Sequence, residues 1–203
     1  MIAKKFLDNF SLIFLNLKNQ INKIYQNSNW YDKKISKVYN DNLSYKPSPH
    51  LLSSIVKYQK KKYKIDDFAL ASVWDNNINS KDFKKLNNFF WFFSLDLKSS
   101  KKTVQSLIIN WINNNHRFNK KSWDFDLTSK RIISWLSNHE LSYDNDNIKY
   151  KNKFNSSIQK QVNHLLNEIK NSKIFEDKMI GCAAIILTGL AYRNNKVYLD
   201  NGL

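Results

Sequence analysis

The spacing of apolar residues constrains the fold of this chain more than any other feature. Apolar side chains recur three or four residues apart, as in Phe10, Phe14, Leu17, Ile21 and Ile24, which is the period of one face of an α-helix. Only 3 Gly and 2 Pro occur among 203 residues, too few for the frequent tight turns of a β-sandwich or barrel. The sequence therefore predicts an all-α protein made of long helices joined by polar loops.

The same pattern divides the chain into two parts. Residues 1–80 combine an N-terminal helix with an irregular, basic, tyrosine-containing region, in which residues 66–74 suit either a short strand or a half-turn. Residues 81–203 form a helical domain with Thr128 as a candidate helix N-cap. Helices are expected there at residues 83–97, 102–113, 129–138, 151–171 and 179–193. Short loops between such helices favour antiparallel hairpins, stacked either in a line or around an axis as a toroid.

The charge balance indicates a polyanionic partner without choosing one. The formal net charge is +16 with a pI near 9.7, which is typical of proteins that meet nucleic acid, anionic membranes or acidic polysaccharides. Lysine is spread along the whole chain and no nucleic-acid motif is present, so we expect no nucleic-acid partner. The sequence contains no H-E-x-x-H, G-x-G-x-x-G or P-loop motif, and its four histidines are scattered, so we expect no metal and no cofactor.

The N-terminal helix is amphipathic. Asp8, Asn9 and Asn16 interrupt its apolar residues, which argues against a cleavable secretion signal. Such a helix either packs on the protein body or makes a peripheral contact with a membrane surface, and we expect packing on the body. Cys182 lies in an apolar run. It is the single cysteine of the sequence, which excludes an intramolecular disulfide.

Residues 110–136 combine tryptophans with arginines. Trp111, Arg117, Trp123, Arg131 and Trp135 recur there at helical spacing. Indole rings stack on the C–H faces of sugars and guanidinium groups pair with carboxylates or sulfates, so this segment suits an acidic polysaccharide. The alternative is that Trp111 and Trp135 belong to the core of two packed helices.

The candidate site residues each have a structural alternative. Arg131 either binds a substrate anion or pairs with Asp124 or Asp126, and Trp123 lies in a polar loop that would suit a sugar-stacking platform. His139 and Tyr143 form the only close His/Tyr pair, a weak candidate for a catalytic proton-transfer dyad because a histidine at a helix end is more often a cap. His164, between core leucines, is expected to be an interior histidine with its hydrogen bonds satisfied.

Several short motifs together resemble the helical N-terminal part of the heparinase II/III-like family. The order of motifs carries the resemblance: L-N-N-F-F-W-F-F-S-L-D-L at 86–97, I-I-N-W-I at 108–112, S-W at 122–123, S-K-R-I-I-S-W-L at 129–136, Gln161 with His164-Leu165, and the apolar helix 183–190. Proteins of this polysaccharide-lyase type have an incomplete (α/α) toroid followed by a β-sandwich. The resemblance implies such a toroid here, covering about the last 120 residues, with the sandwich missing after Leu203.

The resemblance also implies a function and a compartment. Active family members cleave uronate-containing polysaccharides by β-elimination, in which a Tyr or His removes a proton and an Asn, His or Arg neutralises the carboxylate. The neutraliser often precedes the apolar helix, where this chain has Phe175-Glu176-Asp177-Lys178, and carboxylates there would repel a uronate. We therefore expect Arg117, Trp123, Arg131 and Trp135 to bind acidic polysaccharide without cleavage by this segment. The family implies the cell envelope, while the lack of a clear signal leaves the cytoplasm open.

Overall fold

Helices are the regular secondary structure throughout the described part of the chain, as the apolar periodicity predicts. The computed structural model describes residues 2–39, 42–46, 80–94, 101–144, 146–193 and 195–202, and no strand occurs among them. The elements are α1 (Ile2–Gln26), α2 (Asn29–Ile35), α4 (Ser80–Asn87), the 3-10 helix η2 (Phe90–Ser94), α5 (Lys101–Asn114), α6 (Phe125–Ser137), α7 (His139–Ser142), α8 (Ile148–Glu168), α9 (Phe175–Ala191) and α10 (Lys196–Gly202).

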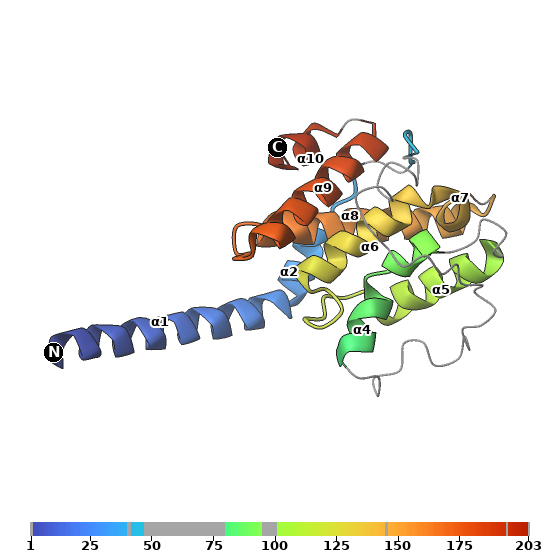
Figure 1. Ribbon diagram of the computed structural model, residues 1–203. Coiled ribbons are helices and arrows are strands. Elements are labelled where there is room, and N and C mark those ends of the chain that lie inside the picture. The colour runs from blue at the N-terminus through green and yellow to red at the C-terminus, as the bar shows by residue number, and fades with distance from the viewer. Residues whose placement is uncertain are drawn as a thin grey trace.

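Helix α6 lies in the middle of the helical body. It contacts α8 and α9 as well as α4, η2 and α7, and ten of its thirteen residues are buried. In Figure 1, α6 and α9 both run from lower left to upper right, and α8 runs in the opposite direction behind α6. Successive long helices therefore reverse direction. This alternation follows from short connections, which bring consecutive helices together as antiparallel neighbours.

Glycine allows α9 to approach α6 closely. A Cβ atom added at Gly181 would overlap the ring of Phe125, so the backbone of α9 passes directly over the first turn of α6. Beyond α9 the chain folds back, and α10 packs along α9 with the Tyr198 side chain fully buried. The apolar residues of α9 thus obtain neighbours on both sides.

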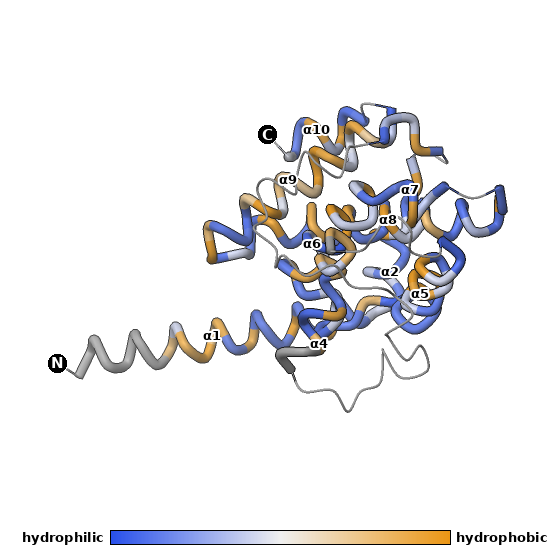
Figure 2. The backbone as a smooth tube through the Cα atoms, turned by 45° about the vertical axis from the view of Figure 1, so that its right-hand side comes forward, coloured by the Kyte–Doolittle hydropathy of each residue, from blue (hydrophilic) through white to orange (hydrophobic). Residues whose placement is uncertain are grey.

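Helix α1 departs from the expectation that it packs on the body. It forms the predicted helix but projects from the body as a free arm (Figure 1), and Figure 2 shows apolar and polar residues alternating along the coloured part of the helix, nearer the body. Its last turn is tied to the body: Gln26 donates a hydrogen bond to Glu168 at 2.8 Å, and Tyr25 packs edge-on against Tyr31 with ring centroids 5.3 Å apart. Packing on the body is therefore wrong for most of this helix.

The helix expected at residues 83–97 is broken in the middle. Asn88 accepts a hydrogen bond from the backbone N–H of Phe90 at 2.9 Å, and Phe89 adopts a left-handed backbone conformation with φ of 56°. A local side-chain acceptor of this kind competes with the helical hydrogen bond. The break turns the Phe89 ring into the core, where it meets Trp135 edge-on at 5.2 Å.

Other boundaries also differ from the sequence prediction. Helix α6 starts at Phe125 with Asp124 at the N-cap position, so Thr128 is an interior helical residue and not a cap. Helix α2 lies in a stretch expected to be irregular, and its N-cap Ser28 accepts a hydrogen bond from the Tyr31 N–H at 3.2 Å. The predicted strand or half-turn at 66–74 lies outside the described residues.

The position of Phe89 yields a stability prediction. Its ring is fully buried among aromatic neighbours that include Trp111 and Trp135, so Phe89→Ala should lower the free energy of unfolding by about 3–5 kcal/mol. Phe175, with a 70% exposed side chain, is the matched control, and Phe175→Ala should change it by less than about 0.5 kcal/mol. Urea denaturation measures both, and equal small effects would contradict this packing.

Candidate functional site

Arg131 lies in the interior rather than on a surface. Its side chain is fully buried, and the guanidinium stacks over the Trp111 ring at 3.9 Å from the centroid. Nε donates to Gln161 Oε1 at 2.7 Å, and Nη1 donates to the carbonyl oxygens of Asn87 and Ser122 at 2.8 and 3.0 Å. Nη2 donates to Thr128 Oγ1 at 3.2 Å. Neither of the two expected uses of Arg131, binding a ligand anion or pairing with Asp124 or Asp126, describes this environment.

The hydrogen-bond acceptors around Arg131 are neutral, so none of them supplies a negative charge to balance the guanidinium. Burial lowers the pKa of the Arg131 guanidinium well below its usual value because the charged form has left water. Four hydrogen bonds from the guanidinium to carbonyl, amide and hydroxyl oxygens compensate for the lost hydration. The nearby aspartate Asp126 pairs instead with Lys130 at 2.7 Å, one turn along α6.

The candidate tryptophans are likewise core residues. Trp135 and Trp111 are fully buried and meet edge-on with centroids 5.5 Å apart. Trp123 is 2% exposed; its Nε1 donates to the Asn115 carbonyl at 3.1 Å and its ring packs edge-on against His164 at 5.6 Å. The structure thus buries both Trp135 and Trp123, so that neither ring has an exposed face on which a sugar could stack.

His164 is an interior histidine, as predicted. Its Nδ1 lies 2.6 Å from the Tyr31 hydroxyl and its Nε2 lies 2.9 Å from the Trp123 carbonyl oxygen. Since a carbonyl only accepts, we assign the ring proton to Nε2, and Nδ1 then accepts from Tyr31. Burial lowers the pKa of His164 to about 4, and the nearby Arg131 charge acts in the same direction. The neutral ring therefore joins α8 to α2 and to the loop before α6.

His139 and Tyr143 stand at the two ends of α7 and do not form an exposed dyad. The Tyr143 side chain is 4% exposed. Its hydroxyl oxygen accepts hydrogen bonds from the Leu43 N–H and the Asn155 side-chain amide, each at 3.4 Å. What joins the pair is the backbone bond from the Tyr143 N–H to the His139 carbonyl at 2.8 Å. A buried phenol with these contacts is placed to support packing rather than to meet a polysaccharide.

A cleft opens beside this core, on the surface formed by α8, the end of α5 and the segment after α2. Its volume is about 650 Å³, within the range of small-ligand sites. Apolar side chains, amides, hydroxyls and two lysines line it: Ser36, Val38, Ile112, Asn113, Asn115, His116, Trp123, Asn152, Lys153, Ser156, Ser157 and Lys160. Of the predicted ligand residues, Trp123 lies in this lining, and Arg117 is an exposed residue that follows the lining residue His116.

Cross-links between elements hold the cleft open in one shape. Lys160 Nζ donates to Asp32 Oδ1 and to the His116 carbonyl, each at 2.7 Å, so it joins α8 to α2 and to the loop after α5. Lys153 Nζ reaches Asn113 Oδ1 at 3.4 Å across the cleft. Because Asp32 neutralises Lys160, Lys153 is the lysine of the cleft that carries most of its charge toward solvent.

Sequence reasoning missed the α8 side of the cleft. One face of α8 supplies these residues, because adjacent pairs recur at three- and four-residue intervals: Asn152, Lys153, Ser156, Ser157 and Lys160. The signal was present as a polar stripe opposite the apolar residues Phe154 and Ile158. The composition of this stripe is ordinary for an exposed helix face, whereas residues 110–136 have the tryptophans and arginines typical of a sugar site. In the structure Trp111, Trp123, Arg131 and Trp135 of that segment are buried.

The start of α9 is acidic, as the sequence indicates. Glu176 and Asp177 occupy its first turn, and burial together with the neighbouring Asp126 carboxylate raises the pKa of Asp177. Among the residues that the structure describes, no group of three or more His, Cys, Asp or Glu side chains could hold a metal ion.

No family model, curated protein or solved structure gives a significant match to this chain.

Two arginines that share one sequence segment should respond very differently to substitution. Arg131→Ala would leave buried acceptors unpaired and should lower the free energy of unfolding by about 3–5 kcal/mol. Arg117→Ala, at an exposed position, should change it by less than about 0.5 kcal/mol. Chemical denaturation of both variants tests this, and a stable Arg131→Ala protein would show that Arg131 is not part of the core.

The His164 environment predicts a pH dependence of stability. The pKa of His164 is about 4 in the folded chain against an ordinary value of 6.5, so the unfolded chain binds the extra proton first as pH falls. The stabilisation is complete above pH 6.5 and is lost as pH falls toward 4, by about 3 kcal/mol in total. His164→Gln should remove this component, so its unfolding free energy should fall less steeply over the same range. Parallel pH profiles for the two proteins would contradict it.

Proposed function

We propose that this chain is the helical part of a heparinase II/III-like protein and that the cleft beside α8 binds a segment of acidic polysaccharide. The observation that carries the proposal is the chemistry of the cleft lining. Amides and hydroxyls exchange hydrogen bonds with sugar hydroxyl groups, and an ammonium group pairs with a uronate carboxylate or a sulfate. Val38 and Ile112 supply apolar surface suited to the C–H face of a sugar ring.

The residues behind the family resemblance support a shared architecture. Trp123, Arg131, Gln161 and His164 belong to separate motifs in the sequence, yet all have hydrogen bonds in the interior. Arg131 donates to Gln161 and to the Ser122 carbonyl, and His164 bonds to the carbonyl of the next residue, Trp123. A motif order of this kind is expected when the residues jointly hold helices α6 and α8 in place. The reversal of direction between successive long helices is consistent with the hairpins of a toroid, which remains part of this proposal.

Binding without cleavage is the form of this function that the geometry favours. β-Elimination needs a base at the uronate and a group that neutralises its carboxylate. The Tyr143 hydroxyl is buried against Asn155, and Glu176 and Asp177 stand where a neutralising group would be expected from the resemblance. A non-catalytic glycan-binding module is therefore the version proposed for this segment.

The cleft makes a prediction about two lysines of the same helix. Lys153→Gln removes the solvent-facing charge of the cleft and should weaken binding to alginate, hyaluronan or heparan sulfate by about fivefold. Lys149→Gln, at an exposed position of α8 outside the cleft lining, should leave it within about twofold. Titration by calorimetry at fixed ionic strength gives the dissociation constants.

Three control measurements decide the proposal. Neutral dextran should bind more weakly than the acidic chains, and single-stranded DNA should not bind more tightly than they do. Near-ultraviolet absorbance should stay flat during incubation, because an unsaturated uronate forms only on elimination. Equal losses for Lys153→Gln and Lys149→Gln would move the site away from the cleft, and a sustained absorbance rise would show that the segment is a lyase.

A further inference from the structure

From Phe10 to Ile24, helix α1 presents an apolar face whose side chains are exposed in the described part of the chain. Phe10, Phe14, Leu17, Ile21 and Ile24 have side chains exposed by 52% to 72%. At 100° per residue they fall within one narrow arc of the helix, so they form a single stripe. An exposed apolar stripe of this length marks a contact surface.

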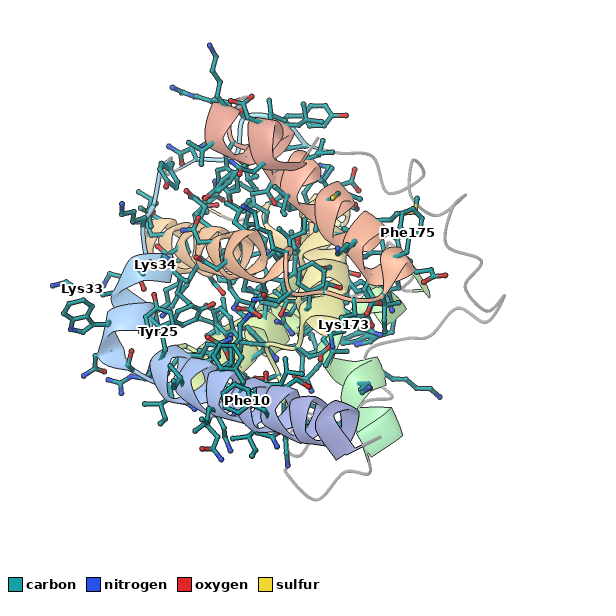
Figure 3. All side chains as sticks on the ribbon, turned by 90° about the vertical axis from the view of Figure 1, so that its left-hand side faces the viewer. Phe10, Tyr25, Lys33, Lys34, Lys173 and Phe175 are labelled. Atoms are coloured by element: carbon teal, nitrogen blue, oxygen red, sulfur yellow. The ribbon has the colours of Figure 1, made fainter. Side chains whose placement is uncertain are left out.

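The other side of α1 is mixed, and its charged residues are basic. It carries Lys18, Lys23, asparagines and glutamines beside Leu12 and Leu15, and no acidic residue occurs between positions 10 and 26. The next helix adds Lys33 and Lys34, which Figure 3 shows near the Tyr25 end of α1. Positive charge therefore surrounds the apolar stripe along the helix and at its base.

We propose that α1 lies in the interface of an anionic lipid bilayer, with its apolar stripe in the acyl boundary and its lysines at the headgroups. A helix with a distinct apolar face, aromatic residues on that face and lysines on the other is of the type that binds membrane surfaces. None of the helices in the described part of the chain has the length and apolar character needed to cross a bilayer.

Charge decides between a bilayer and a second copy of α1. Two copies would bring lysines together with no carboxylate between residues 10 and 26 to pair with them, whereas an anionic headgroup layer supplies the missing charge. Trp30, 83% exposed at the start of α2, adds a residue type enriched at membrane interfaces. Phe10 and Phe14 also occupy seam positions that dimeric coiled coils fill with branched aliphatic residues.

Two leucines of α1 provide a matched test. Leu17, on the stripe, and Leu15, on the opposite side, are 52% and 51% exposed, so Leu17→Asp and Leu15→Asp make the same chemical change at equal exposure. The probe is flotation with vesicles of phosphatidylglycerol and phosphatidylcholine in equal parts. Leu17→Asp should weaken binding by about tenfold or more, and Leu15→Asp by less than about threefold. Both variants should melt like the parent chain because neither side chain is buried.

Further binding experiments distinguish an anionic bilayer from other partners of α1. Pure phosphatidylcholine vesicles should bind more weakly, added salt should reduce binding to the anionic vesicles, and Lys18→Gln with Lys23→Gln should have a similar effect. Equal binding by the two leucine variants would overturn the proposal. So would failure to bind anionic vesicles, together with a dimer in sedimentation that Leu17→Asp dissociates. Neither result bears on the cleft, which lies on other elements.

Discussion

The fold depends on one buried cation that is satisfied without a buried anion. Arg131 joins α6 to the end of α4 through Asn87, to α8 through Gln161 and to the loop before α6 through Ser122, and it stacks on Trp111 of α5. Removing a charge from water costs several kcal/mol, so every donor must find an acceptor. This requirement fixes where four separate elements meet, and the aromatic cluster and the cleft are built around that point.

The sequence predicted much of the fold because the apolar period is a strong local signal. Helices α1, α5, α8 and α9 appear close to where the spacing placed them, within a few residues at the ends. The break at Phe89 is accompanied by a local bond from the Phe90 N–H to the Asn88 side chain, and the start of α6 at Phe125 comes earlier than the Thr128 cap suggested. Such boundaries are set by individual hydrogen bonds, which periodicity does not register.

The candidate site was harder to predict than the fold for a physical reason. Arginine and tryptophan suit both a sugar-binding surface and a polar core, and spacing alone does not separate the two roles. In this chain Arg131, Trp123 and Trp135 turn inward, while the ordinary amides, serines and lysines of α8 face the cleft. The placement of α8 beside α2 and the end of α5 turns that face of α8 into one wall of the cleft.

The most direct measurement of this account is nuclear magnetic resonance of the side-chain N–H groups during titration with an acidic oligosaccharide. The Arg131 Nε–H is fully buried and bonded to Gln161, so its signal should exchange slowly with water and should not move when the sugar is added. The side chains of Asn113, Asn115 and Asn152 line the cleft, so their amide signals should shift in a saturable way as the sugar is added. An Arg131 signal that exchanges quickly and shifts with the sugar, while the three amides stay still, would contradict both the buried arginine and the cleft.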